Sequence, residues 1–433
     1  MSISEQHPKP HKILIITSSG GGGLLQAANA KEQEFKAKDP KITVLKRDVM
    51  KDWMWKWAGR FCIYQWNRAQ LQGDVWTQSF FGTVIPIAGY LFWPHIFFCT
   101  LYTLFKENVD QVLDTQIMGT SAVIKAIRIY NWKKQRAVYL EKVLVDLPSK
   151  KATHFFGSIK SLSKKDRRHF KLITVAPLLE EGETDEQFWT ENCNLTPAEL
   201  VFENYYVRQS FRKFQNVQKK TELFKIKTCF YNQEELELIQ KSLKRGSLSY
   251  EVQGNEISFT INPNDRLFTI LLGSQPAQES TLNYVKKFIQ LAKEEPEARI
   301  HLFVFCANHN PKQETLFKRV VEKVTHARDY PSNLSIVPMS FQTDEVIAPL
   351  FFHSHMTCTR SGGQTAMELM CVGQKEIWVH SETKKKKSQP TNEELLAGIP
   401  GWESANAAYL QKMKGAKIVT PDHFVPYARI LLR

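Results

Sequence analysis

Short apolar runs alternate with helix-favouring stretches along much of the chain. Residues 13–16 are consecutive apolar residues, a pattern typical of a strand buried on both faces, and residues 26–35 are rich in helix-forming types. Between these segments lie four consecutive glycines, at positions 20–23. Glycine loses more backbone freedom on folding than other residues, so such a run indicates a sharp turn or a close backbone approach to another group. The segment therefore predicts a strand, a glycine loop and a helix, in that order.

The start of this predicted helix is a candidate anion site. Backbone N–H groups and the positive end of the helix dipole would point at the glycine loop, which suits a phosphate or another electron-rich ligand. Gly21, Gly22 and Gly23 are the residues that we expect to line it. A tight strand-to-helix turn without a ligand is the alternative.

The second half of the chain, residues 265–420, repeats the alternation of strand and helix patterns. The apolar runs "RLFTILLG", "RIHLFVFCA", "LSIVPM", "HMTCTR" and "KEIWVH" each precede a loop or a helix. Such repetition predicts an α/β fold with a parallel sheet covered by helices. Ligands of such sheets bind at the carboxyl ends of the strands, so we expect a site in the loops that follow these runs.

Polar and small residues are concentrated in four loops of this region. They are "GSQPAQESTLN" at 273–283, "CANHN" at 306–310, "TRSGGQTAMEL" at 359–369 and "IPGWESANAAYL" at 399–410. A Ser-Gly-Gly turn such as the one in the third loop is most often only a turn. Polar loops at successive strand ends, however, indicate a ligand site.

The third and fourth loops offer the chemistry of a nucleotide site. Residues 361–363 open a helix whose amides would hold a diphosphate. Glu368 follows one to two turns later, where a carboxylate is well placed to accept hydrogen bonds from ribose hydroxyls. In the fourth loop, Glu403 and Asn406 share one helix face.

A membrane-seeking segment lies in the first half. Residues 75–105 contain no Asp, Glu, Lys or Arg and are long enough to span a bilayer. Just before them, residues 52–66 alternate tryptophans with basic residues, which is typical of a membrane interface. We predict a surface that enters one leaflet without crossing it; two buried core helices are the alternative. The residues expected to interrupt a spanning helix are Gly82, Pro86, Gly89 and Pro94.

Composition narrows the class of protein. With 42% hydrophobic and 24% charged residues the chain is globular. The formal charge of +14 calls for an anionic partner. We expect an anionic membrane surface and a phosphorylated ligand, not nucleic acid, because no nucleic-acid-binding signature accompanies the charge.

The seven cysteines form no CxxC pair or metal-like cluster, and the polar first residues show no cleavable signal. We therefore expect reduced thiols, no metal and a cytoplasmic location.

The motifs resemble those of a known family. "SSGGGGLLQAANA" is similar to the amino-terminal glycine loop of the monogalactosyldiacylglycerol synthases and of the related peptidoglycan enzyme that adds GlcNAc to a membrane lipid. "CANHN", "TRSGGQTAMELMCVG" and "IPGWESANAAYL" resemble that family's carboxy-terminal donor motifs in the same order, and "GSQPAQESTLN" resembles its GSQ loop. The match covers about the first thirty residues and most of residues 265–420, while the middle matches only diffusely.

The resemblance implies an architecture and an activity. It implies two Rossmann-like domains facing across a cleft (the GT-B architecture). Independently of the family, the membrane-seeking segment fits this layout as an insertion in the first domain. We place the domains at residues 1–262 and 263–433, because Pro and Asn in "INPND", at residues 261–265, favour a linker there. A UDP-linked sugar donor would bind the second domain without a metal or another cofactor, and a membrane lipid acceptor would reach the first. The enzyme would work at the cytoplasmic face of a membrane.

The resemblance also implies roles for residues from all four loops. Carried over motif by motif, they are Ser361, Gly362, Gly363, Gln364 and Thr365 for the diphosphate, Glu368 for the ribose, Glu403 and Asn406 for sugar hydroxyls or phosphate, Ser274 and Gln275 for the phosphates or base, and Cys306 to Asn308 for the base.

This chain departs from the family pattern at two positions. Leu24 stands where the glycine loop of the family carries a His, and Trp402 stands where a Gln usually precedes the Glu of the fourth motif. The missing His removes a polar group expected near the donor sugar or the nucleophile. Trp402 would either stack on a sugar face or pack in the protein.

Glycosyl transfer needs a base or an oriented acceptor on one side and a stabilised diphosphate on the other. Asp146, at the end of a predicted strand, is a candidate base, or else a cap for the loop before Pro148. His154 is a second candidate base, or a structural histidine, and Glu403 is the third catalytic candidate. The sequence thus favours a membrane-associated glycosyltransferase; a nucleotide-sugar epimerase or hydrolase and a non-catalytic nucleotide-sugar-binding protein are the alternatives.

Overall fold

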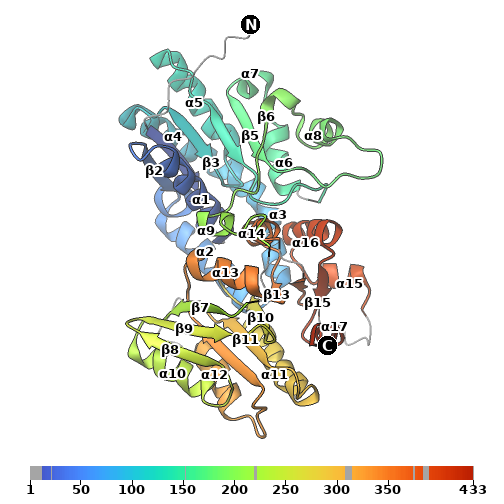
Figure 1. Ribbon diagram of the computed structural model, residues 1–433. Coiled ribbons are helices and arrows are strands. Elements are labelled where there is room, and N and C mark those ends of the chain that lie inside the picture. The colour runs from blue at the N-terminus through green and yellow to red at the C-terminus, as the bar shows by residue number, and fades with distance from the viewer. Residues whose placement is uncertain are drawn as a thin grey trace. The chain divides into compact units, whose positions relative to one another are not determined.

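The computed structural model places the chain in two compact units. The first unit comprises Met1–Gln65 and Phe80–Arg208, and the second comprises Trp66–Ser79 and Gln209–Arg433. Each has its own six-stranded parallel sheet with helices between the strands, which confirms the predicted α/β class with two Rossmann-like sheets (Figure 1). The structure describes residues 12–20, 22–151, 153–218, 222–307, 315–373, 376–383 and 390–432.

The sheet of the first unit has the strand order β2-β1-β3-β4-β5-β6. The chain leaves β1 toward β2 and then returns to the other side of β1 as β3, so the strand order reverses between β1 and β3. Its strands are β1 (Lys12–Thr17), β2 (Thr43–Asp48), β3 (Gln111–Asp114), β4 (Leu140–Val143), β5 (Phe170–Thr174) and β6 (Leu200–Phe202). Its helices include α1 (Gly22–Lys38), α4 (Trp93–Glu107), α5 (Thr120–Lys134), α6 (Thr153–Lys160), α7 (Lys164–Arg167) and α8 (Asp185–Cys193), with short helical turns at Val49–Trp53 and Pro197–Glu199.

The parallel sheet of the second unit has the order β12-β11-β10-β13-β14-β15, and its order reverses between β10 and β13. Its strands are β10 (Arg266–Leu271), β11 (Ile300–Phe305), β12 (Leu334–Met339), β13 (Met356–Thr359), β14 (Ile377–His380) and β15 (Lys417–Val419). The predicted strands are confirmed, and they are buried on both faces as continuous apolar runs must be. The helices are α9 (Gln209–Arg212), α10 (Gln233–Leu243), α11 (Gln278–Glu294), α12 (Leu316–Thr325), α13 (Asp344–His353), α14 (Gly363–Cys371), α15 (Asn392–Ala397), α16 (Gly401–Lys414) and α17 (Val425–Leu432).

A small antiparallel sheet also belongs to the second unit. It has the order β7-β9-β8, from β7 (Phe224–Cys229), β8 (Ser249–Gln253) and β9 (Glu256–Ile261). Helix α10, between β7 and β8, is bound to β12, because its Ser242 donates a hydrogen bond of 2.8 Å to the carbonyl of Ile336. The linker that the sequence predicts at residues 262–265 lies inside this unit, as the turn between β9 and β10.

Two helices each contain a point at which the chain passes from one unit to the other. They are α2 (Lys56–Leu71) and α3 (Val75–Leu91). The predicted interruptions at Gly82, Pro86 and Gly89 are wrong, since α3 is continuous through all three; context outweighs intrinsic helix propensity there. The predicted interruption at Pro94 is correct, because α4 begins one residue earlier and a proline is accommodated in the first turn of a helix.

The described part of the chain contains no single helix with the length and apolarity to cross a bilayer. The pair α3 and α4 meets those requirements only when taken together, and it is bent by 63°. Several aromatic side chains in α2 to α4 are largely exposed, as Trp57 at 71% and Tyr90 at 80% illustrate. Helices packed wholly in a core would not leave such side chains in water.

Candidate functional site

The reversal of strand order in the second sheet brings two predicted loops together. In parallel sheets a ligand crevice forms at such a point, outside the carboxyl ends of the two strands. The loop after β10 contains Ser274 and Gln275, and it begins with Gly273 in the left-handed conformation at φ +87°. A Cβ atom on Gly273 would lie 3.8 Å from Cδ of Arg360, which follows β13, so the first and third loops are neighbours.

Helix α14 opens directly after β13. Its N-cap residue, Gly362, has an extended conformation and, as a glycine, contributes no side-chain cap. Helical hydrogen bonding begins with the Ala366 N–H, which donates to the Gly362 carbonyl at 2.9 Å, so Gly363, Gln364 and Thr365 form the first turn. A Cβ atom on Gly362 would meet no atom within 4 Å. There is thus room beside Gly362 at the positive end of α14, and helix starts of this kind are sites at which proteins bind phosphate.

The third loop is tied to the fourth by buried hydrogen bonds. The Ser361 hydroxyl donates to the Glu403 carbonyl at 2.7 Å, and the Asn406 side chain donates to the Ser361 carbonyl at 2.8 Å. All three residues are buried. Ser361 and Asn406, predicted to contact the donor, are thus brought together, and these bonds fix the start of α14 against α16.

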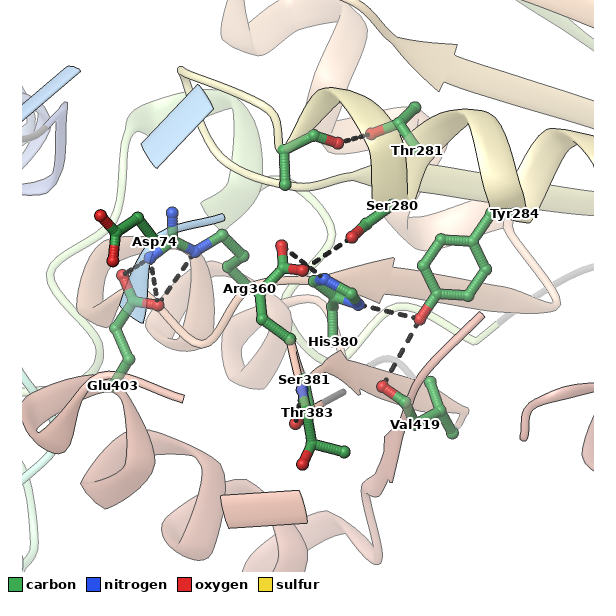
Figure 2. A network of polar contacts seen from close by, with 12 residues as sticks. Asp74, Ser280, Thr281, Tyr284, Arg360, His380, Ser381, Thr383, Glu403 and Val419 are labelled. Atoms are coloured by element: carbon green, nitrogen blue, oxygen red, sulfur yellow. Dashed lines mark hydrogen bonds and ion pairs between the residues drawn. The ribbon is translucent and has the colours of Figure 1, made fainter. Parts of the chain in front are cut away.

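A buried ion pair links the same two elements. The Arg360 Nη2 lies 2.9 Å from Oε2 of Glu403, and Nε lies 3.1 Å from the same oxygen (Figure 2). Both side chains are less than 10% exposed. Arg360 also donates to the side chain of Gln78, which in turn donates to the carbonyls of Ala69 and Asp74. Sequence reasoning missed Arg360, although its place directly after a strand, in "TRSGG", was the available signal.

Glu368 is buried in α14 one turn beyond the open end. Gln364 Nε2 donates to Oε1 of Glu368 at 3.2 Å, an i, i+4 contact within the helix. The two predicted donor residues are therefore together, and their predicted contacts with ribose and diphosphate stay predictions.

A second polar network follows β14. The Tyr284 hydroxyl lies 3.1 Å from Nδ1 of His380, whose Nε2 lies 3.0 Å from Glu382, and Ser280 donates to Glu382 at 2.7 Å (Figure 2). Burial alone would raise the pKa of Glu382, but the nearby His380 and the Ser280 hydroxyl outweigh burial and lower this pKa. Glu382 and Trp76 line a cavity of about 730 Å³ in the second unit. Sequence reasoning did not single out this network.

Trp402 packs in the protein. Its ring stacks on that of Trp66, with centroids 5.4 Å apart and an interplanar angle of 27°. Of the two alternatives that the sequence left open, the structure shows packing.

The base-contact prediction concerns residues after β11. Cys306 is fully buried, and its backbone N–H donates to the carbonyl of Met339 at 2.7 Å. Burial raises the pKa of its thiol, so Cys306 is a neutral core residue. Asn308 and, in the first unit, Gly21 lie outside the described residues.

The glycine loop of the first unit is shaped by packing. A Cβ atom on Gly20 would lie 2.9 Å from Cε of Met50, and Gly22 and Gly23 begin α1. Leu24, at the position where the family carries a His, is buried in the same turn of α1. These contacts explain Gly20 without a ligand, and ligand contacts of Gly22 and Gly23 stay a prediction.

Asp146 and His154 come together in the first unit. Asp146 follows β4, His154 is in the first turn of α6, and Nε2 of the imidazole lies 3.0 Å from Oδ2 of the carboxylate. Asp146 is 7% exposed. A carboxylate that orients an imidazole is a common acid–base pair, because it stabilises the protonated ring.

The described residues contain no group of three or more His, Cys, Asp or Glu side chains arranged to hold a metal ion. The catalytic candidates from the sequence are placed as the Asp146–His154 pair and as Glu403, whose carboxylate is bound to Arg360.

No protein-family model and no curated protein matches this sequence. Among solved structures, MurG of Acinetobacter baumannii is 12% identical with a TM-score of 0.46, over 98% of this chain and 91% of that chain. A putative UDP-N-acetylglucosamine 2-epimerase of Listeria monocytogenes is 11% identical with a TM-score of 0.43, over 98% and 88%. The UDP-GlcNAc 2-epimerase of Neisseria meningitidis bound to UDP-GlcNAc is 13% identical with a TM-score of 0.40, over 97% and 98%. Similarity at this level assigns no reaction to this chain.

The ion pair predicts strong coupling in a double-mutant cycle. Arg360→Met or Glu403→Met alone leaves one buried charge without its partner, so we expect each to lower the free energy of unfolding by about 3–5 kcal/mol, and the double variant to lose clearly less than the sum. Denaturant unfolding of the full chain measures all three.

The exposed pair of Lys225 and Glu251 is the matched control, for which we expect coupling of no more than about 1 kcal/mol. Equal coupling in the two cycles would contradict a structural role for the buried pair.

Proposed function

We propose that this chain is a membrane-associated glycosyltransferase that moves a sugar from a UDP-linked donor to a lipid acceptor. The observation that carries the proposal is the start of α14, which has a glycine N-cap with room beside it and lies where the strand order of the second sheet reverses. That is a place where the backbone can hold a diphosphate without a metal.

The donor would bind along the carboxyl edge of the second sheet. The diphosphate would accept hydrogen bonds from the amides of residues 362–365, and Glu368 would accept them from the ribose. Ser274 and Gln275, on the neighbouring loop, would contact the phosphates or the base. Negative charge grows on the diphosphate as the bond to the sugar breaks, and the helix end stabilises that charge.

Glu403 and Asn406 are better placed to position other groups than to touch the sugar. Glu403 holds the guanidinium of Arg360, and Asn406 holds the backbone of Ser361. We infer that both act through the third loop, by fixing Arg360 and the start of α14.

The acid–base chemistry would come from the first unit. His154 would take the proton of the acceptor hydroxyl as its oxygen forms a bond to the anomeric carbon, and the bond from that carbon to the diphosphate breaks. Asp146 would stabilise the imidazolium that forms, at the 3.0 Å contact described above. In this proposal the base would come from this pair and not from the glycine loop, where Leu24 stands in place of the polar His of the family.

The lipid acceptor is inferred from an exposed aromatic region in the first unit. Lys125 lies over the ring of Trp93, and Lys133 over the ring of Trp132, so cations and indoles occur together as they do at a lipid headgroup layer. The exposed large side chains that define the region are Trp55, Trp57, Phe61, Tyr64, Phe80, Ile87, Tyr90, Leu91, Phe98, Tyr102 and Trp132.

Gly362→Ala tests the donor site. Because the new methyl group meets no protein atom within 4 Å, we expect unchanged thermal stability. It would occupy the space that a diphosphate needs, so the dissociation constant for UDP should rise at least about tenfold in calorimetry.

Gly157→Ala is the control, a helical glycine of the first unit whose added Cβ also meets nothing within 4 Å. It should leave UDP binding unchanged. Equal UDP affinity in Gly362→Ala and the unmodified protein would refute the site, and an altered sugar configuration without transfer to lipid would identify an epimerase instead.

His154→Asn tests the proposed base. The substitution keeps a polar side chain but removes the proton acceptor, so we expect transfer to lipid to fall by about 10²–10⁴-fold at unchanged UDP affinity. Product formation in vesicles, measured with radiolabelled UDP-sugars, gives the rate. Asp146→Asn should lower the rate in the same direction, and a rate that survives in both variants would exclude the pair as the base.

Trp57→Ala combined with Tyr90→Ala tests the membrane surface. These side chains are 71% and 80% exposed, so their loss should weaken sedimentation with anionic vesicles at little cost in stability. Met413→Ala with Ile430→Ala removes two exposed apolar side chains of the second unit and is the control. The aromatic region is not a membrane surface if both double variants sediment alike.

A further inference from the structure

Helices α11 and α12 of the second unit pack against each other (Figure 1). A basic groove is lined by residues of both helices. Its volume is about 540 Å³. None of the residues assigned above to the donor or the acceptor lines it. The groove is therefore a feature that the proposed function does not use.

Two rows of cationic side chains border the groove. Lys286 and Lys293 stand two turns apart on one face of α11, and Arg319 and Lys323 stand one turn apart on α12, followed by His326. At a rise of 1.5 Å per residue, seven positions span roughly 10.5 Å along a helix. Positively charged side chains thus extend for about 10 Å along the groove. They stand on both sides of its floor.

The charge of the groove is only thinly compensated. Glu322 is the one acidic side chain among the described residues that line it. Arg319 is paired with Glu279 at 2.6 Å. Lys286 and Lys323, in contrast, have no ion-pair or hydrogen-bond partner in the described ranges of the chain. Two lysine ammonium groups are therefore available to a ligand.

The floor of the groove is apolar. Leu282 and Ile289 come from the same face of α11 as the two lysines, and each is 8% exposed. A ring or a short carbon chain would rest on this floor, and its phosphate substituents would reach the lysine ammonium groups at the rims. Lys binds phosphate in this way as a point charge at the end of an apolar stem.

We propose that the groove binds a compact anion that carries several phosphate groups, either free in solution or as the headgroup of a phosphorylated lipid. A single phosphate would engage only one end of a site roughly 10 Å long. The volume matches a small-molecule site, not an extended macromolecular surface, so an acidic protein segment is not the occupant. The proposal stands independently of the glycosyltransferase function.

The test uses the full-length protein and two probes. Inositol hexakisphosphate, measured by calorimetry, represents the free ligand; phosphatidylcholine vesicles with phosphatidylinositol 4,5-bisphosphate, measured by sedimentation, represent the lipid. We expect Lys286→Gln with Lys323→Gln to weaken binding of at least one probe about tenfold or more.

The matched control is Lys287→Gln with Lys318→Gln. It removes the same charge from the same two helices at positions that do not line the groove, so binding should change by less than about twofold. UDP affinity should be unchanged in both variants, which separates this test from that of the donor site.

The affected probe identifies the source of the phosphates. Loss with inositol hexakisphosphate alone indicates a soluble ligand, loss with vesicles alone indicates a lipid, and loss with both indicates recognition of the headgroup itself. The proposal would be overturned if neither probe bound, or if the groove and control variants lost affinity for the probes equally. Binding of a polyglutamate peptide as tight as that of the phosphorylated probes would also overturn it. Unchanged thermal transitions establish that the variants are folded.

Discussion

A buried guanidinium–carboxylate pair organises the carboxyl edge of the second sheet. Arg360 leaves the end of β13, Glu403 comes from the first turn of α16, and Gln78 comes from a segment nearly three hundred residues earlier. An unpaired charge at this depth is strongly unfavourable, so these three segments must adopt one arrangement together. The bonds of Ser361 with α16 follow from that arrangement, and with them the place where α14 opens.

The pair also holds this edge of the sheet together through contacts within the protein. The loops after β10 and β13 are held by a left-handed glycine, a buried ion pair and side-chain bonds to backbone carbonyls. A diphosphate that met such loops would find its donors already oriented, and little conformational entropy would be lost on binding. Glu403, which the resemblance implied would contact the donor, is engaged with Arg360 of the protein itself.

Much of the fold could be predicted from the sequence, because parallel strands buried on both faces need continuous apolar runs. The runs at Ile300–Phe305 and Leu334–Met339 are fully buried strands, and the Ser-Gly-Gly turn does open α14. The side-chain pairs could not be predicted in the same way. Neither the stacking of Trp402 on Trp66 nor the approach of His154 to Asp146 leaves a local pattern, since both depend on tertiary packing. The continuity of α3 through Gly82 and Pro86 likewise overrides local propensity.

The short segment Trp66–Ser79 has a consequence for how the molecule is made. It packs within the second unit, although it is synthesised long before the rest of that unit. During synthesis, this segment leaves the ribosome first, and it can pack in its final place only after the carboxy-terminal half has been synthesised. Cutting the gene at Gln209 would separate the halves at the wrong place, since a recombinant carboxy-terminal fragment would lack both Gln78 and the ring that Trp402 stacks upon.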